Sequence, residues 1–181
     1  MTQPEVKIRQ SADDDMVRIT EIYGRSVIED SASFEFQPPD VTEMMRRRSA
    51  LLDAGYPYLV AEVDGRVEGY SYAGAYRARI GYINTVENTV YVDPGLKRGG
   101  IGRALMEKLI EECESRGYRQ MIAIIGGSDH LPSIDFHKAL GFIEAGNLRG
   151  VGYKHDKWLD TVFMQLPLGP GGTTPPDKIP G

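Results

Sequence analysis

The sequence predicts a single mixed α/β domain. Short alternating or apolar runs are typical of strands, longer segments with apolar residues every three or four positions are typical of helices, and glycine or proline separates them. The 181 residues suffice for one domain of ordinary size, and the 41% hydrophobic and 26% charged residues are those of a soluble globular protein. The expected order is strand, two helices, three strands, helix, strand, helix and two closing strands.

Alternation, capping residues and a hairpin signal define the N-terminal half. Val6 and Ile8 alternate with polar residues, and Ser11 is expected to cap a helix that begins with three aspartates. Asp40 or Thr42 begins the second helix, and an Asp-Gly pair follows the next strand as a hairpin turn. The expected elements here are strand 6–10, helix 11–27, helix 40–55, and strands 57–63 and 67–76.

Glycines and one long apolar run define the C-terminal half. Gly117 and Gly141 end helices, and the apolar run 121–125 predicts a strand covered on both faces. Residues 167–181 contain nine Pro or Gly, so we expect a domain over 1–166 followed by a disordered tail with no role in the fold. The expected elements are strand 86–92, helix 101–113, strand 121–125, helix 133–140, and strands 142–151 and 158–166.

Composition excludes several classes of protein. A net charge of −5 without a basic stripe argues against nucleic acid as the main partner. No apolar run approaches the ~20 residues that span a bilayer, and the N-terminus lacks an apolar signal region, so we expect a cytoplasmic protein with no membrane partner. The single cysteine, Cys113, excludes an internal disulfide framework, and His155 lacks a second ligand at metal-binding spacing, so no metal is expected.

A strand, a glycine-rich bend and a helix follow one another over residues 86–106, an arrangement that binds phosphate. The first amides of a helix lack partners and carry partial positive charge, and glycines let an anion approach them. The P-loop is excluded because Gly102 is followed by Arg-Ala instead of Lys and Ser or Thr, and the dinucleotide fingerprint needs a small residue where Leu105 stands.

What remains resembles the acetyl-CoA signature of the GNAT superfamily of N-acetyltransferases, Gln/Arg-x-x-Gly-x-Gly/Ala, with Lys97 in its first place. Across roughly residues 5–166 the chain is similar to the phosphinothricin / methionine sulfoximine acetyltransferase branch. The motifs that carry this resemblance are Thr85-Val-Glu-x-x-Val-Tyr-Val92, His137-x-Ala-Leu-Gly-Phe142 and Gly152-Tyr-Lys-His-x-x-Trp-Leu-Asp160.

The resemblance implies a mostly antiparallel, twisted central sheet that splays at the acetyl-CoA site and is flanked by about four helices. It implies acetyl-CoA as co-substrate, a small amino acid such as phosphinothricin, methionine sulfoximine or methionine sulfone as acceptor, a part in antibiotic or herbicide resistance, and a homodimer. By matching position, the cofactor-binding candidates are Val90, Tyr91 and Val92 for the thioester and pantetheine arm, Arg98, Gly99, Gly100, Ile101, Gly102 and Arg103 for the pyrophosphate, and His130 and Ser133, where His130 replaces the usual Asn.

Acetyl transfer needs a neutral amine, so some group must take a proton. Glu87 is the candidate base, and the resemblance supports this role. The Val90 amide is the candidate donor to the oxyanion. His137 is either the acid that protonates the leaving thiolate or a hydrogen-bonded helix histidine, and the sequence leaves both open.

The acceptor's carboxylate needs a cation. Arg77 is the first choice, because guanidinium and carboxylate pair in bidentate geometry, and Arg79 is its competitor. Lys154 is expected to reach the substrate across a dimer interface. Two other readings stay open, a protein or peptide N-acetyltransferase and a non-catalytic acyl-CoA sensor on the same fold. The remaining acceptor-site candidates are Phe34, Phe36, Tyr76, Asn88 and Thr89.

Overall fold

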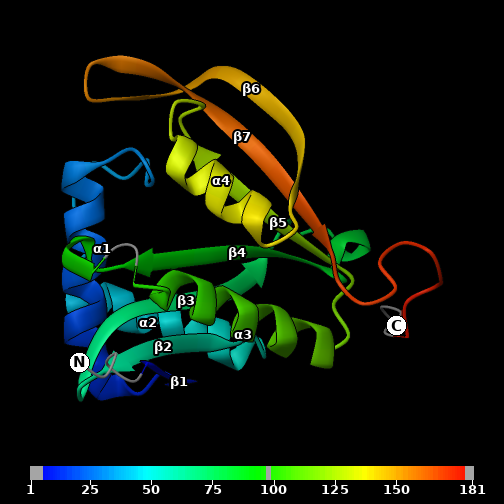
Figure 1. The fold of residues 1–181 in the computed structure, drawn as a ribbon, viewed down its shortest axis with the longest axis horizontal. Helices are drawn as coiled ribbons and strands as arrows, with labels where there is room; N and C mark the ends of the chain where they lie inside the picture. Colours follow the sequence, from blue (N-terminus) through cyan, green and yellow to red (C-terminus); the bar gives the residue numbers. More distant parts are fainter. Residues whose placement is uncertain (1–5, 97–98, 178–181) are drawn as a thin grey trace.

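The computed structural model describes residues 6–96 and 99–177 and contains one seven-stranded sheet in the order β1-β2-β3-β4-β5-β7-β6 (Figure 1). Neighbouring strands are antiparallel except β4 and β5, which are parallel. The mostly antiparallel sheet predicted above is therefore confirmed. The strands are β1 (Val6–Gln10), β2 (Tyr58–Val63), β3 (Arg66–Ala75), β4 (Thr85–Val92), β5 (Gln120–Gly126), β6 (Ile143–Lys154) and β7 (Lys157–Pro167).

In the described part of the chain, four α-helices cover the two faces of the sheet, in the chain order that the sequence predicts. Two of them lie on one face and two on the other (Figure 1). None of the helices in the described ranges has the length and apolar character that crossing a membrane requires. The first pair is α1 (Met16–Glu29) and α2 (Val41–Asp53), and the second pair is α3 (Ile101–Ser115) and α4 (Leu131–Ala139).

Strand alternation divides the core into two clusters. In β2, Leu59 and Ala61 pack in the cluster that contains the apolar face of α3, whereas Tyr58 and Val60 pack against α1 and α2. On the face covered by α1 and α2, the rings of Tyr58 and Tyr70 stack on each other and on neighbouring tyrosine rings. Both faces of the first four strands are thus covered, which fixes β4 firmly at the middle of the molecule.

The pairing of β4 with β5 is short. Within the described ranges, only Thr85–Glu87 of β4 pairs with Gln120–Ile122 of β5, although both strands continue for several residues. Beyond Glu87 the two strands diverge, as Figure 1 shows. This divergence confirms the predicted splay and opens the sheet at its centre.

Two local predictions are wrong. Ser11 does not cap α1, because its hydroxyl accepts a hydrogen bond from Arg48 Nε; the Asp15 carboxylate instead accepts the Ala12 N–H ahead of the helix. β5 is not covered on both faces throughout, because Ile124 is 37% exposed where the strands part. The apolar pattern of a strand does not distinguish a packed position from one that lines an open cavity.

The prediction of a disordered tail from residue 167 is also wrong for the first part of that segment. Leu168 is fully buried in the α3-side core, and its N–H donates to the Arg119 carbonyl. The buried Arg119 guanidinium donates to the carbonyls of Gly171, Thr174 and Pro175. One leucine and one arginine therefore order a Pro/Gly-rich segment whose composition alone predicts disorder.

We expect Leu168→Ala to lower the free energy of unfolding by about 2–5 kcal/mol, as buried leucine truncations do. Leu131→Ala is the matched control, because Leu131 is 60% exposed and its truncation is expected to cost about 0.5 kcal/mol or less. Urea unfolding followed by circular dichroism measures both. Equal midpoints for the two variants would contradict a structural role for the segment after β7.

Candidate active site

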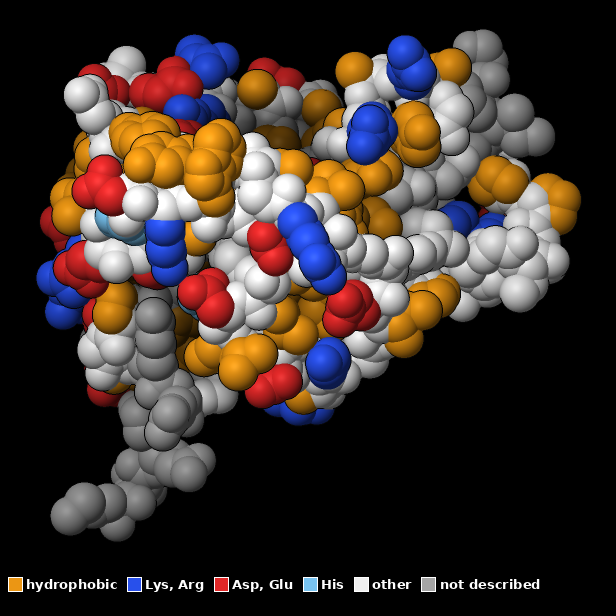
Figure 2. Space-filling model, turned by 90° about the horizontal axis from the view of Figure 1, so that it is seen from above, with side chains coloured by type: hydrophobic (Ala, Val, Ile, Leu, Met, Phe, Trp, Pro, Cys, Tyr) orange, Lys and Arg blue, Asp and Glu red, His pale blue; other side chains and the backbone are white. Residues whose placement is uncertain are grey.

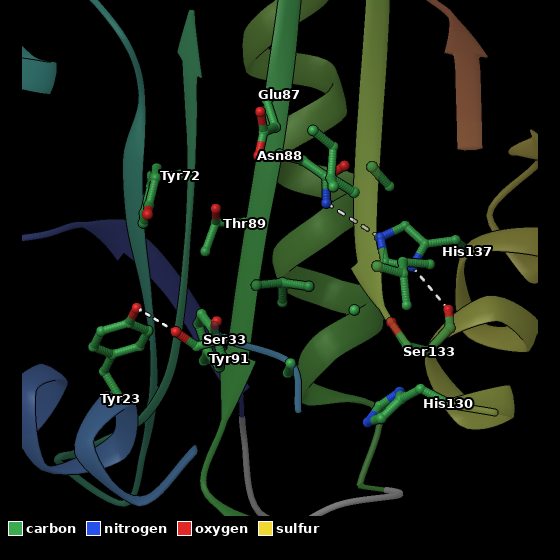
Figure 3. A pocket seen from close by; sticks show the side chains of 16 residues that line it. Tyr23, Ser33, Tyr72, Glu87, Asn88, Thr89, Tyr91, His130, Ser133 and His137 are labelled. Atoms are coloured by element: carbon green, nitrogen blue, oxygen red, sulfur yellow. Dashed lines mark hydrogen bonds between the residues drawn. The ribbon is translucent and has the colours of Figure 1, made fainter. Parts of the chain in front are cut away.

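A cavity of about 260 Å³ lies where β4 and β5 part (Figure 3). Its walls come from α1, the loop after α1, strands β3 to β5, and α4 with its preceding loop. The residues that line it include several predicted site residues, Glu87, Asn88, Thr89, Val90, Tyr91, His130, Ser133 and His137. The structure thus brings together, in one cavity, residues from segments about 50 positions apart.

Glu87 lies on β4 at the last pair of residues before the strands diverge, opposite Ile122 of β5. Its side chain is on the same side of β4 as Thr89 and Tyr72, as Figure 3 shows. Glu87 is half-buried, and this burial raises the pKa of its carboxyl above the ordinary 4.5. A carboxylate with a raised pKa at the edge of a cavity is suited to take up a proton.

His137 and Asn88 meet on the other side of β4 (Figure 3). His137 Nδ1 lies 2.8 Å from the Ser133 carbonyl oxygen, one helical turn earlier, and Nε2 lies 3.2 Å from Asn88 Nδ2. The imidazole is buried, and burial lowers its pKa below the ordinary 6.5. Both ring nitrogens are therefore engaged, and the ring is neutral at neutral pH.

The bend before α3 has the backbone that the sequence predicts for anion binding. Gly100 is the N-cap of α3 and has a φ of +79°, a backbone conformation that residues other than glycine rarely adopt. The helix begins at Ile101, whose side chain is buried in the core. Lys97 and Arg98 lie outside the described residues. Arg103 Nε donates to Glu107 at 2.8 Å on the exposed face of the helix, so its charge is shared with that carboxylate.

Two buried polar atoms of the cavity lack a hydrogen-bond partner in the described part of the chain: Asn88 Oδ1 and His130 Nδ1. Buried polar groups are nearly always hydrogen-bonded, so such atoms indicate a missing partner. His130 and Ser133 lie at the N-terminus of α4, on the opposite wall from Val90.

The loop after α1 is fixed against the cavity by its own chain. Lys154 of β6 is buried, and its Nζ donates to the carbonyls of Asp30 and Ser33 at 2.9 and 2.6 Å. Ser33 Oγ in turn lies 2.9 Å from the hydroxyl of Tyr23. Lys154 was predicted to reach a substrate across a dimer interface, and within its own chain its ammonium group holds this loop in place.

The two phenylalanines of that loop differ in their surroundings. The Phe34 ring packs against Gly126 of β5 and Gly152 of β6 so closely that a methyl group at either glycine would overlap it. Phe36 is 72% exposed and is not in the wall of the cavity. Phe34 is therefore next to the cavity, as expected of a pocket residue, and Phe36 is not.

Neither of the two predicted acceptor arginines, Arg77 and Arg79, lines this cavity. Arg77 and Tyr76 line a second, open groove of about 530 Å³, which Ile122, the partner of Glu87, also lines. The Arg77 guanidinium lies 5.2 Å from the centre of the Tyr76 ring. Arg79 is exposed and not in the wall of either space.

Sequence reasoning missed several residues that shape the site. Tyr23 of α1 and Tyr72 of β3 line the cavity. The sequence signals that could have identified them were the place of Tyr23 on the apolar face of α1 and the position of Tyr72 opposite Thr89 in the sheet. Arg18 of α1 donates to the carboxylates of Glu68 and Asp93, and Asp93 also accepts the Gly95 N–H. These ion pairs anchor the end of β4, from which the glycine-rich bend begins.

Cys113 is a core residue and supplies no nucleophile to this site. The Cys113 thiol is buried, and burial raises its pKa to about 12, so it is not a nucleophile at neutral pH. Among residues 6–96 and 99–177, no group of three or more His, Cys, Asp or Glu side chains is placed to hold a metal ion.

Comparison with known proteins gives consistent matches. The acetyltransferase (GNAT) family model matches residues 20–142. A phosphinothricin N-acetyltransferase from Alcaligenes faecalis is 48% identical over 94% of this chain and 86% of its own. An L-methionine sulfoximine/L-methionine sulfone acetyltransferase from Salmonella typhimurium is 38% identical over 85% of this chain and 90% of its own. The crystal structure of a GNAT superfamily phosphinothricin acetyltransferase from Sinorhizobium meliloti in complex with AcCoA superposes with a TM-score of 0.92 at 44% identity, covering 96% and 94% of the two chains.

Proposed function

The chain belongs to the GNAT acetyltransferase family, and on that premise we propose that it moves the acetyl group of acetyl-CoA to the α-amine of a small amino acid such as phosphinothricin, methionine sulfoximine or methionine sulfone. One observation carries this proposal beyond the family. Glu87, with its raised pKa, lines the cavity where the β4–β5 seam opens, and its register partner Ile122 lines a groove that contains an arginine.

The residues of the first cavity fit acetyl-CoA. The backbone of Val90 to Val92 would lie along the pantetheine arm, and the amides from Gly99 to Arg103 would bind the pyrophosphate. Arg98, also assigned to the pyrophosphate, lies outside the described residues. The unpartnered nitrogen of His130 supports its contact with the arm, with Ser133 beside it. Bound acetyl-CoA supplies the acetyl group as an activated thioester.

Glu87 would take the proton that the amine must lose, directly or through a water molecule. The α-amine of a free amino acid is largely protonated at neutral pH, and a general base is most effective when its own pKa lies near the operating pH. Burial moves the pKa of Glu87 in that direction. The Val90 N–H would donate to the oxyanion that forms as the amine attacks the thioester carbonyl.

The second groove would receive the acceptor amino acid. Arg77 on its wall would pair with the α-carboxylate, and the Tyr76 ring beneath the guanidinium holds that cation near the groove. Ile122 links the groove to Glu87, because the two residues are register partners across the seam. The acceptor amine would thereby reach the carboxylate from the side of β4 that carries Thr89.

We also propose a homodimer, which the sequence resemblance implies. The β6–β7 hairpin exposes large apolar side chains, and Figure 2 shows apolar side chains gathered in groups on the face seen from above. Contiguous exposed apolar surface is typical of protein interfaces. A cytoplasmic location and a part in resistance stay predictions. The exposed apolar residues of the hairpin are Ile143, Leu148, Val151, Tyr153 and Trp158.

Glu87→Gln is expected to lower kcat about 100-fold or more, because glutamine cannot accept the proton, while the Kd for acetyl-CoA changes less than about twofold. In the unmodified enzyme kcat/KM for the acceptor falls as the pH drops through the raised pKa of Glu87, and the variant loses this dependence. Thiol release measured from pH 5 to 9 tests this. Glu111→Gln, at an exposed position on α3, is the matched control, and unchanged turnover in Glu87→Gln would remove Glu87 as the base.

Arg77→Met is expected to raise KM for the amino acid about 10- to 100-fold, because it removes a charge-assisted contact to the carboxylate. Arg79→Met is the matched control and is expected to change KM little. The assay is thiol release with methionine sulfoximine, methionine sulfone, phosphinothricin and a peptide amine. Activity confined to the peptide would contradict the small-acceptor proposal, and binding of acetyl-CoA without turnover on any amine would favour a sensor.

The chain, of mass 20.1 kDa, is expected to behave in solution as a particle of about twice that mass. Trp158→Glu is expected to yield monomers, because it places a charge among the exposed apolar side chains of the hairpin. Ile28→Glu, at an exposed position on α1, is the control that keeps the dimer. Sedimentation equilibrium measures all three, and a monomeric unmodified chain would contradict the proposal.

A further inference from the structure

The cavity continues along the side of β4 that carries Glu87 (Figure 3). Thr89, two residues further along the strand, lines it on this side, together with its register partner Tyr72 of β3. Tyr23 of α1 also lines the cavity and lies beyond them, with its ring 5.2 Å from the ring of Tyr91. This side of the cavity therefore carries first a carboxylate and then a series of hydroxyl groups.

A hydrogen-bonded pair of hydroxyl groups, the Tyr23–Ser33 pair, stands in the cavity wall beyond Thr89. The Tyr23 hydroxyl lies 2.9 Å from Ser33 Oγ, which also accepts the Glu35 N–H at 3.2 Å. Ser33 is buried and Tyr23 is half-buried. Burial raises the pKa of the Tyr23 hydroxyl, so it keeps its proton at neutral pH and can donate a hydrogen bond.

The loop that carries Ser33 is held in place from several sides. Lys154 Nζ of β6 donates to the Ser33 carbonyl at 2.6 Å, and the Phe34 ring packs against glycines of β5 and β6. The Glu35 carboxylate accepts from Arg47 Nη1 of α2 at 2.7 Å, so its charge is paired. A ligand that pressed on the Tyr23–Ser33 pair would therefore have to break contacts with α2, β5 and β6.

The three groups on the α-carbon of an amino acid leave it in different directions. In the proposed function Arg77 pairs with the carboxylate, and Glu87 takes a proton from the amine. Arg77 lines its groove together with Thr85, the first residue of β4. Tyr23 instead lies near the other end of this strand, against Tyr91. With the carboxylate towards the start of β4, the side chain of the acceptor leaves towards Tyr23.

We propose that Tyr23 is a specificity-determining residue, and that the Tyr23–Ser33 pair ends the space for the acceptor side chain and selects short side chains with a polar end. This inference rests on the proposed function and names the part of the acceptor that the enzyme distinguishes. Hydroxyl groups donate to the oxygens of a sulfone, a sulfoximine or a phosphinate, whereas an alkyl end would leave them without a partner.

The first test uses acceptors that differ only in the length of the S-alkyl group. Methionine sulfoximine carries a methyl group where buthionine sulfoximine carries a butyl group. The unmodified enzyme is expected to prefer the methyl compound about 100-fold in kcat/KM, and Tyr23→Ala, which removes the ring, is expected to reduce this preference about tenfold. Tyr23→Phe keeps the ring and is expected to keep the preference. Tyr23→Val replaces the alanine variant if that variant does not fold.

The second test concerns the hydroxyl group. Tyr23→Phe is expected to lower kcat/KM for methionine sulfone about tenfold and to change kcat/KM for methionine little, because methionine has no oxygen on its sulfur. The Kd for acetyl-CoA and the pH dependence of turnover are expected to stay unchanged. Tyr56→Phe is the matched control, because Tyr56 packs against the α3-side core and lies outside the cavity wall.

Each other result overturns the inference. An equal loss for every acceptor in the Tyr23 variants would indicate a structural role alone, and unchanged ratios in folded variants would mean that the side chain lies elsewhere. Equal use of the two sulfoximines by the unmodified enzyme would show that the Tyr23–Ser33 pair does not end the space. If the unmodified chain acetylated no amino acid, the proposed function would fail first, so the two failures are distinguishable.

Discussion

The structure depends on a single constraint, the early end of the pairing between β4 and β5. Three residues of each strand form the only parallel contact in the described ranges of the sheet, and beyond Glu87 the strands separate. The rest of the fold supports this gap. Helices pack on both faces of β4, and ion pairs of Arg18 hold its far end, so the strand stays extended without a neighbour on one edge. Along an unpaired strand edge, the backbone N–H and C=O groups that would pair with another strand are free to bind a ligand.

Successive side chains of β4 point to opposite sides of the sheet, so the residues along the gap form two separate groups. Glu87 and Thr89 face one side, where Tyr72 also lies, and Asn88 faces the other, towards His137 and α3. Burial disfavours the charged form on both sides, so it raises the pKa of Glu87 and lowers the pKa of His137. It makes the Glu87 carboxylate a better base, and it keeps His137 neutral so that the ring serves as a hydrogen-bond acceptor. A one-residue shift of register would exchange these roles.

Much of this arrangement could be predicted from the sequence, because local patterns specify it. The order of elements, the left-handed glycine before α3, the hairpin at Asp64-Gly65 and the place of Glu87 follow from alternation, turn residues and motif spacing. Contacts between distant segments could not be predicted. Lys154 holds carbonyls more than 120 residues away, and Arg119 binds the segment after β7, because both satisfy backbone groups that no pattern marks. The Asn88–His137 pair likewise depends on how α4 meets β4.

The packing of Phe34 has a consequence for how this enzyme can be altered. Its ring fills space that exists because Gly126 and Gly152 have no side chains, and these glycines belong to two different strands. At Gly152 the Phe34 ring alone fills the space, so a larger residue there requires a smaller one at position 34. At Gly126 the Ser31 carbonyl oxygen also lies where a methyl group would be, so a smaller residue at position 34 would not make room there.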